Sequence, residues 1–139
     1  SIMKVCVLAS GSKGNCCYIE SNNTKILIDI GINCTNVETK LKQINVDPSE
    51  IEGIFITHTH TDHTDGLKVF TKKYNTKVYL TEKMYEDINK HINNYEIIGQ
   101  ELNLNDIKII TVKTSHDTSD SNGYIVESNE LMIGIKNNI

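Results

Sequence analysis

The order of apolar and polar positions along the chain predicts strands interspersed with helices. Nearly continuous apolar runs of about four to eight residues are typical of strands. Apolar residues that recur every three or four positions, such as Val37, Leu41 and Ile44, predict one face of an amphipathic helix. These criteria place strands at residues 2–8, 16–20, 25–30, 53–57, 77–80, 107–114, 123–127 and 131–135, and helices at residues 35–44, 67–74 and 82–92. The alternation predicts an α/β fold with mixed sheets.

Length and apolar content suffice for one domain, residues 1–139. The chain has 139 residues, of which 38% are hydrophobic, so it can bury a core without disulfides. The four Cys residues form no Cys-x-x-Cys pair, and we expect buried, reduced thiols. No apolar run approaches the roughly 18 residues of a membrane span, and the chain begins without a secretory signal layout. We therefore expect a cytoplasmic protein without a membrane partner.

The charge of the chain limits how it could contact nucleic acid. The formal net charge is −4 with neutral His, which argues against a generally basic surface. All 14 cationic residues are Lys, so the chain lacks the planar guanidinium fork that binds phosphate or guanine at two points. Any contact with nucleic acid is therefore expected to be local and to use Lys point charges.

Three of the five His residues lie within six positions, directly after the predicted strand 53–57. The segment reads His58-Thr59-His60-Thr61-Asp62-His63. In an extended or tightly looped backbone, His58 and His60 project to one side and can share a metal ion, while Asp62 and His63 can hold a second. Imidazole nitrogens with one carboxylate suit Zn²⁺, and the same set accepts Mn²⁺ or Fe. The alternative is a His-rich surface turn without a ligand.

A second candidate segment, Thr114-Ser115-His116-Asp117, follows the predicted strand 107–114. His116 is placed to complete the ligand set of the first ion, and Asp117 is interpreted as a supporting partner or a turn cap. Consecutive Ser, His and Asp residues cannot fold onto one another as a hydrolase triad. His91, on the predicted helix 82–92, is interpreted as an exposed helix residue.

Several motifs resemble the metallo-β-lactamase superfamily. The His segment after Ile54-Phe55-Ile56-Thr57 resembles its metal-binding motif, and Leu27-Ile28-Asp29-Ile30-Gly31 resembles its first motif. The turn Ser10-Gly11-Ser12-Lys13-Gly14-Asn15 and the pair Gly123-Tyr124 are similar to the VicX/YycJ-type branch of bacterial metal-dependent hydrolases. The resemblance implies an αββα sandwich with two divalent ions at the sheet edge. It also implies that Asp29 orients the His loop, and that the activity is phosphodiester hydrolysis of an exonuclease type.

The resemblance covers essentially the whole chain, yet the bridging Asp and the further His that the family carries are not recognisable. Asn138 stands where the bridging carboxylate is expected, and a neutral amide bridges cations poorly. We therefore expect an amino-terminal half, or somewhat more, of the fold, truncated at its C-terminus. We further expect weak turnover or none by this chain alone, and self-association into a homo-oligomer through exposed apolar surface.

Three functional hypotheses remain open at this stage. The first is a nuclease-like phosphodiesterase acting on single-stranded DNA or RNA, in which Asp62 also steers or accepts the proton of the attacking water. The second is hydrolysis of a small thioester, lactam or lactone. The third is a non-catalytic metal-binding half-domain.

Overall fold

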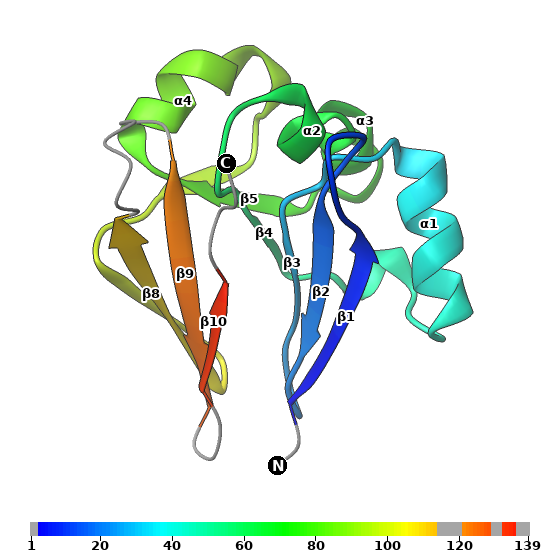
Figure 1. Ribbon diagram of the computed structural model, residues 1–139, viewed down its shortest axis with the longest axis horizontal. Coiled ribbons are helices and arrows are strands. Elements are labelled where there is room, and N and C mark those ends of the chain that lie inside the picture. The colour runs from blue at the N-terminus through cyan, green and yellow to red at the C-terminus, as the bar shows by residue number, and fades with distance from the viewer. Residues whose placement is uncertain (1–2, 114–120, 129–131, 136–139) are drawn as a thin grey trace.

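The computed structural model of the chain describes residues 3–113, 121–128 and 132–135. Two sheets lie face to face, and the helices lie beside the larger sheet (Figure 1). The strands are β1 (Lys4–Ala9), β2 (Cys16–Glu20), β3 (Lys25–Ile28), β4 (Gly53–Phe55), β5 (Lys77–Leu80), β6 (Tyr95–Ile97), β7 (Glu101–Leu104), β8 (Ile107–Lys113), β9 (Asn122–Glu127) and β10 (Met132–Ile135). The helices are α1 (Cys34–Gln43), α2 (Thr61–Thr64), α3 (Leu67–Tyr74) and α4 (Glu82–Ile88), with 3₁₀ turns η1 (Pro48–Glu50) and η2 (Asn89–His91).

The larger sheet is mixed, as the sequence predicts. Its strand order is β1-β2-β3-β4-β5-β6, with β1 to β3 antiparallel and β3 to β6 parallel. After the first residue of each, β3, β4 and β5 carry apolar residues on both faces, because helices cover one face and the second sheet covers the other. Their carboxyl ends therefore meet at one edge of the sheet, where the chain turns into α2 and α4.

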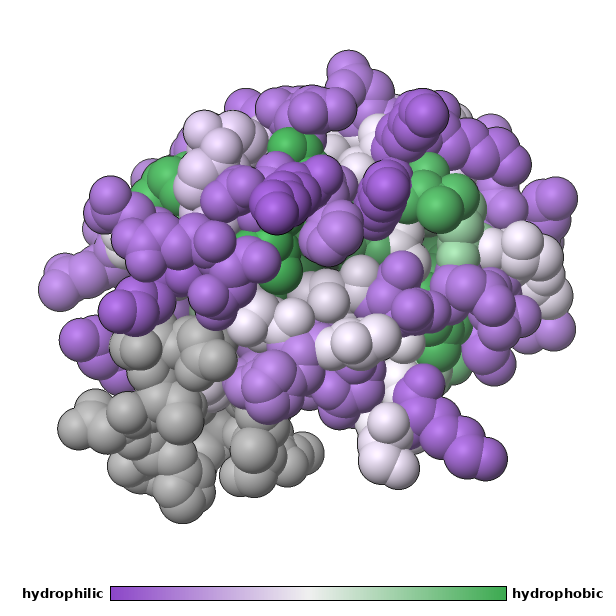
Figure 2. Space-filling model, turned by 90° about the horizontal axis from the view of Figure 1, so that it is seen from above, coloured by the Kyte–Doolittle hydropathy of each residue, from purple (hydrophilic) through white to green (hydrophobic). Residues whose placement is uncertain are grey.

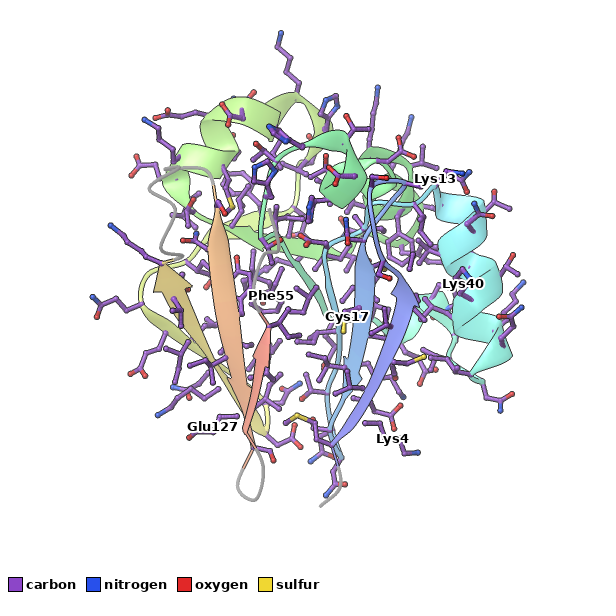
Figure 3. All side chains as sticks on the ribbon, viewed as in Figure 1. Lys4, Lys13, Cys17, Lys40, Phe55 and Glu127 are labelled. Carbon is purple, nitrogen blue, oxygen red and sulfur yellow. The ribbon has the colours of Figure 1, made fainter. Side chains whose placement is uncertain are left out.

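The smaller sheet is antiparallel, in the order β10-β9-β8-β7, and packs against the inner face of the larger one. Phe55 lies between the two sheets in Figure 3 and stacks on Tyr79 at a ring-centroid distance of 4.5 Å. The buried Tyr124 packs edge-on against Phe55 and donates its hydroxyl hydrogen to the Ile56 carbonyl oxygen at 2.5 Å. The second sheet thus contacts the segment that leads into the His motif.

A carboxylate also joins the turns of the two sheets. Asp106, between β7 and β8, accepts hydrogen bonds from the hydroxyls of Ser21 at 2.7 Å and Thr24 at 2.6 Å, and from the Asn23 backbone N–H at 3.3 Å. Burial alone raises the pKa of this carboxyl, but the three donors together hold its pKa below the ordinary value. Asp106 therefore stabilises the sandwich mainly as an anion.

A helix layer covers the outer face of the larger sheet and buries the main core. Val37 and Leu41 of α1, with Leu67 and Phe70 of α3, are fully buried there. Asn33 caps α1, and Thr81 caps α4 by accepting the Met84 backbone N–H. None of the helices in the described ranges is long and apolar enough to cross a membrane. The predicted α/β class with mixed sheets is confirmed, and one layer of helices and two layers of strands lie within the described residues.

Some boundaries differ from those that the sequence predicts. The strand predicted at 25–30 ends at Ile28, because Asp29 takes a left-handed backbone conformation with φ 63°. The helix predicted at 82–92 ends at Ile88 and continues as the 3₁₀ turn η2, which contains His91. All four Cys thiols are free as predicted, yet Cys6 and Cys17 are only half buried. The short strands β6 and β7 were missing from the sequence prediction.

Candidate metal centre

The candidate site lies at the edge where the parallel strands end, and it is built around one buried carboxylate. Asp29 follows β3, and Thr57 and His58 follow β4. The Asp29 carboxylate accepts the Thr57 backbone N–H at 2.7 Å and the Thr57 hydroxyl at 2.5 Å. Its backbone N–H donates to the Phe55 carbonyl oxygen at 2.8 Å. The two strand ends are thereby fixed to each other.

His63 is the third partner of this carboxylate. Its Nδ1 lies 2.7 Å from Asp29 Oδ2, and both side chains are almost fully buried. We assign the proton of the pair to Nδ1, because Asp29, which already accepts both Thr57 donors as a carboxylate, has only acceptor oxygens to offer the ring. Burial raises the pKa of Asp29, although His63 and Thr57 oppose this rise. Burial of His63 works against its charged form, but the hydrogen bond to Asp29 and the charges of Asp29 and Asp62 outweigh it and raise the pKa of His63.

The backbone of Asp62 is held by the turn between β1 and β2. Its carbonyl oxygen accepts the Asn15 backbone N–H at 2.7 Å and the Asn15 side-chain amide at 3.2 Å. The chain at Gly31 passes so close that an added Cβ would lie 1.8 Å from the same oxygen. The Gly31 N–H donates to the Asn15 carbonyl at 2.8 Å, and the Ile30 N–H donates to the His63 carbonyl at 2.9 Å. Three chain segments therefore converge on the loop that carries Asp62 and His63.

His58 and His60 form a second pair. Their ring centroids lie 3.8 Å apart, with the ring planes at 81°, and the His58 and His63 centroids are 5.4 Å apart. His58 is buried, whereas His60 is exposed. The Nδ1 atom of His58 accepts the His60 backbone N–H at 3.1 Å. The segment thus brings all three of its imidazoles together at one edge of the sheet.

The Asp62 and His63 side chains are placed as two ligands of one metal ion would be. Because Asp29 holds the Nδ1 proton of His63, the lone pair of the neutral ring is on Nε2, which lies 3.5 Å from Asp62 Oδ2. Two ligand atoms at tetrahedral angles around Zn²⁺, each about 2.0–2.2 Å from the ion, are separated by roughly 3.4 Å. A carboxylate that orients the far nitrogen of a metal-binding His is the usual supporting arrangement.

Within residues 3–113, 121–128 and 132–135, no three His, Cys, Asp or Glu side chains form a group that could hold one ion. His116, which the sequence proposes as a further ligand, lies outside the described residues, as do Thr114, Ser115 and Asp117. So does Asn138. The ligand set His58, His60, Asp62, His63 and His116 therefore remains a prediction.

An apolar groove opens beside the site, between the two sheets. It has a volume of about 330 Å³, and Asp29, Thr57 and His63 lie at its polar end. Val5 and Val7 of β1 line its wall and are 45% and 63% exposed. Cys17, which points from β2 toward this space in Figure 3, also lines it. Burial raises the pKa of the Cys17 thiol to about 11, so it is not a reactive thiolate.

Sequence reasoning missed the residues that hold the loop. Thr57 and Asn15 carry no metal-binding signal of their own, although both lie in segments that the motif comparison singled out. Gly31 likewise follows Asp29 in the motif, but its close contact with Asp62 depends on tertiary structure. Seen from this end of the molecule, the surface is mostly hydrophilic, with small hydrophobic areas between the polar residues (Figure 2).

The chain matches one protein-family model and several curated proteins. The family model described as Anti-Pycsar protein Apyc1 matches residues 9–106. Exodeoxyribonuclease YycJ of Bacillus anthracis is 31% identical over 136 residues, covering 93% of this chain and 52% of that protein. Exodeoxyribonuclease WalJ of Streptococcus pneumoniae is 34% identical over 126 residues, covering 82% of this chain and 46% of that protein. The chain thus spans about half the length of the curated relatives it matches.

The fold is shared with solved structures. The metallo-beta-lactamase fold protein YhfI from Bacillus subtilis superposes with a TM-score of 0.77, covering 95% of this chain and 60% of that chain. Its sequence identity to this chain is 15%, so this likeness concerns the fold alone.

Proposed function

Since this chain belongs to the metallo-β-lactamase superfamily, in the family described as Anti-Pycsar protein Apyc1 and with YycJ-like relatives, we propose that it supplies the metal-binding part of a metal-dependent phosphodiesterase acting on nucleic acid. The observation that carries the proposal is the Asp29–His63–Asp62 arrangement, in which a buried carboxylate sets the tautomer of one ligand beside a second. The exodeoxyribonuclease names of two relatives support nucleic acid as the substrate.

The proposed ligands divide into two groups. His58, His60 and His116 would hold one divalent ion, and Asp62 and His63 would hold the other, with Zn²⁺ favoured by the imidazole-rich set and Mn²⁺ or Fe as alternatives. When bound, such ions lower the pKa of a coordinated water and stabilise negative charge on phosphate oxygens. The second group has only two protein ligands, so we expect low turnover by this chain alone.

The residues of the chain itself have separable roles. Asp29 keeps the proton on Nδ1 of His63 and so directs the Nε2 lone pair toward Asp62. The side chain of Asp62 is 34% exposed, so it can reach a substrate and accept a proton from water at a free carboxylate oxygen. Asn15 holds the Asp62 backbone and thereby positions that carboxylate.

Metal binding is the first test. Elemental analysis and calorimetric Zn²⁺ titration should show metal in the wild-type chain and a loss of at least about tenfold in affinity for His58→Ala/His60→Ala. The exposed His91→Ala, outside the proposed ligand set, is the matched control and should bind metal as the wild type does. Equal metal content in all three proteins would contradict the ligand assignment.

Hydrolysis is the second test. With Zn²⁺ or Mn²⁺, labelled single-stranded oligonucleotides should be cleaved faster than a lactam or a thioester. Asp62→Asn should lower the rate by roughly 100-fold or more. The neighbouring exposed Asp65→Asn should leave it within about twofold. A measurable wild-type rate that Asp62→Asn leaves unchanged would refute the role of Asp62.

The apolar groove favours one other candidate function. Hydrolysis of a small thioester, lactam or lactone would use the same metal ligands, and the groove lined by Val5 and Val7 next to His63 would bind an apolar body. Faster turnover of a thioester than of an oligonucleotide would support this candidate. Metal binding without turnover of either would support a non-catalytic metal-binding role.

A further inference from the structure

A second concave surface, on the helix layer, is lined almost entirely by cationic and amide side chains. It is a groove of about 310 Å³ between α3 and the segment 90–94 that follows α4. Both helices lie in the upper part of Figure 1. Its lining residues are Lys68, Thr71, Lys72, Asn75, Lys90, His91, Asn93 and Asn94. No Asp or Glu side chain is among them, although the chain as a whole carries a net charge of −4.

The helical repeat explains how α3 forms one wall. Lys68, Thr71, Lys72 and Asn75 follow one another at intervals of three, one and three residues, so they share one face of the helix. Leu67 and Phe70 occupy the opposite, buried face. The two ammonium groups on the groove face are carried by residues one turn apart, about 6 Å along the helix axis.

The lysines of the groove take no part in the ion pairs of the described part of the chain. Lys68, Lys72 and Lys90 make no ion pair with any residue of the described ranges, whereas Lys25, Lys73 and Lys77 pair with Glu50, Glu38 and Glu96. A concave wall with several cations and no anion concentrates positive potential and attracts anions. The groove therefore gathers three such lysines on one concave surface, which suits the local Lys contact expected from the sequence.

Its shape and chemistry favour a chain of phosphates. Lys68 and Lys72 are spread along the groove, which suits successive anionic groups, and the amides of Asn93 and Asn75 add hydrogen-bond donors for phosphate oxygens. No Phe, Tyr or Trp ring lines the groove, and His91 carries the one aromatic ring among its lining residues, so it offers no row of stacking rings for successive bases. Its occupant would be held mainly by its phosphate backbone.

The groove also lies close in the chain to the candidate metal centre. Helix α3 begins at Leu67, four residues after His63, and Gly66 between them donates its N–H to the Ile30 carbonyl at 2.9 Å beside the site. Lys68, in the first turn of α3, is thus the end of the groove nearest the site. A nucleic-acid strand whose end reaches the metal centre would continue along α3 past Lys68 to Lys72.

We propose that the groove lined by Lys68, Lys72, Lys90 and His91 binds the phosphate backbone of single-stranded nucleic acid and guides it to the metal centre. This inference rests on the proposed nuclease function for the direction of the strand, but binding in the groove needs no metal. The groove would give the proposed nuclease a second site that binds the substrate away from the reacting phosphate.

Binding of a fluorescein-labelled single-stranded oligothymidylate to the whole chain, measured by anisotropy in EDTA, tests the groove without any contribution from metal. The variant Lys68→Gln/Lys72→Gln/Lys90→Gln should lower affinity by about tenfold or more at low salt. It should also reduce the slope of log affinity against log salt by about 2, since each phosphate contact to a single strand contributes roughly 0.7.

The matched control is Lys40→Gln/Lys42→Gln/Lys113→Gln, which removes the same charge from positions outside the groove. It should change the slope by less than about 0.5. Circular dichroism and thermal unfolding would establish that both variants fold. Equal losses in the two variants, or no loss in either, would overturn the groove assignment.

The hydrolysis assays distinguish failure of the groove proposal from failure of the proposed nuclease function. If the groove variant loses oligonucleotide binding while the wild type hydrolyses a thioester or lactam faster than an oligonucleotide, the groove stands and the nuclease function fails. If the wild type cleaves oligonucleotides and the groove variant binds them as the wild type does, the groove fails and the nuclease function stands. Tighter binding of RNA than of DNA would contradict recognition of the phosphate groups alone, because the two differ in the 2′-hydroxyl group.

Discussion

Replacement of Gly31 by Ala is expected to displace the loop that carries Asp62 and His63. The new Cβ would lie 1.8 Å from the Asp62 carbonyl oxygen, 2.4 Å from the Asp62 carbonyl carbon and 2.6 Å from the Asn15 nitrogen. All three are backbone atoms, so no side-chain rotation relieves the overlap. To reach even 3.0 Å, the two chain segments must separate by about 1.2 Å.

The stability that Gly31→Ala loses can be worked out from the hydrogen bonds that this separation breaks. The bond from Asn15 N to Asp62 O is 2.7 Å long, and that from Gly31 N to Asn15 O is 2.8 Å long. The bond from Ile30 N to His63 O, at 2.9 Å, joins the same segments. At about 1 kcal/mol each, their loss lowers the free energy of unfolding by roughly 2–3 kcal/mol. For a domain of this size, that corresponds to a fall in Tm of roughly 6–12 °C.

Urea unfolding and thermal melts followed by circular dichroism would measure the loss, and Zn²⁺ titration would measure the displacement of the ligands. We expect metal affinity to fall by at least about tenfold. Gly99→Ala is the matched control, because no heavy atom lies within 4 Å of its added Cβ, and it should change stability by less than about 0.5 kcal/mol. A Gly31→Ala chain as stable as the wild type, with unchanged metal affinity, would refute the reasoning.

Three further changes have defined outcomes. Asp29→Asn should weaken Zn²⁺ binding by roughly 10–100-fold, because the carboxylate that fixes the His63 tautomer is lost, and unchanged affinity in the titration would contradict this. Asp106→Asn should cost about 1 kcal/mol at pH 7. The donors lower the pKa of Asp106, so the stability difference between the wild type and Asp106→Asn should be full above about pH 4 and should shrink as the pH falls further. A difference in urea unfolding that does not change with pH would contradict stabilisation by the Asp106 anion. Tyr124→Phe should cost roughly 1–2 kcal/mol in thermal unfolding, since the Ile56 carbonyl loses its buried donor, and a variant that is no less stable would show that water replaces the hydroxyl.

The elements that depend on short stretches of sequence can be predicted from the sequence alone. Buried strands such as residues 53–57 are readable from their apolar runs, and the spacing of His58, His60 and His63 is readable from the chain alone. Strand β6 was missed because Tyr95–Ile97 is only three residues long, and its pairing with β5 depends on the sheet that it completes. Helix α2 is a single turn, which is too short for periodicity to reveal.

The support of the site could not be read in the same way. Asn15 and Asp62 are 47 residues apart, and their contact exists only when the β1–β2 turn closes on the His loop. Gly31 has no property in the sequence that predicts its close packing against Asp62. Such contacts depend on how two segments approach in three dimensions, which neither composition nor spacing encodes. Resemblance to a family found these segments, but it did not state what they touch.

The hydrogen-bonded loop around Asp62 and His63 also bears on the entropy of metal capture. Fixing a flexible side chain at a binding site costs roughly 0.5–1.5 kcal/mol of conformational entropy. Here Asp29 and Asn15 restrict His63 and Asp62 as the chain folds, and the two proposed ligand atoms lie 3.5 Å apart, close to the separation that one ion requires. The site is preorganised, so an arriving ion would orient few groups. Its affinity would then be set by the ion's own dehydration and by the number of ligands, with little contribution from ordering of the loop.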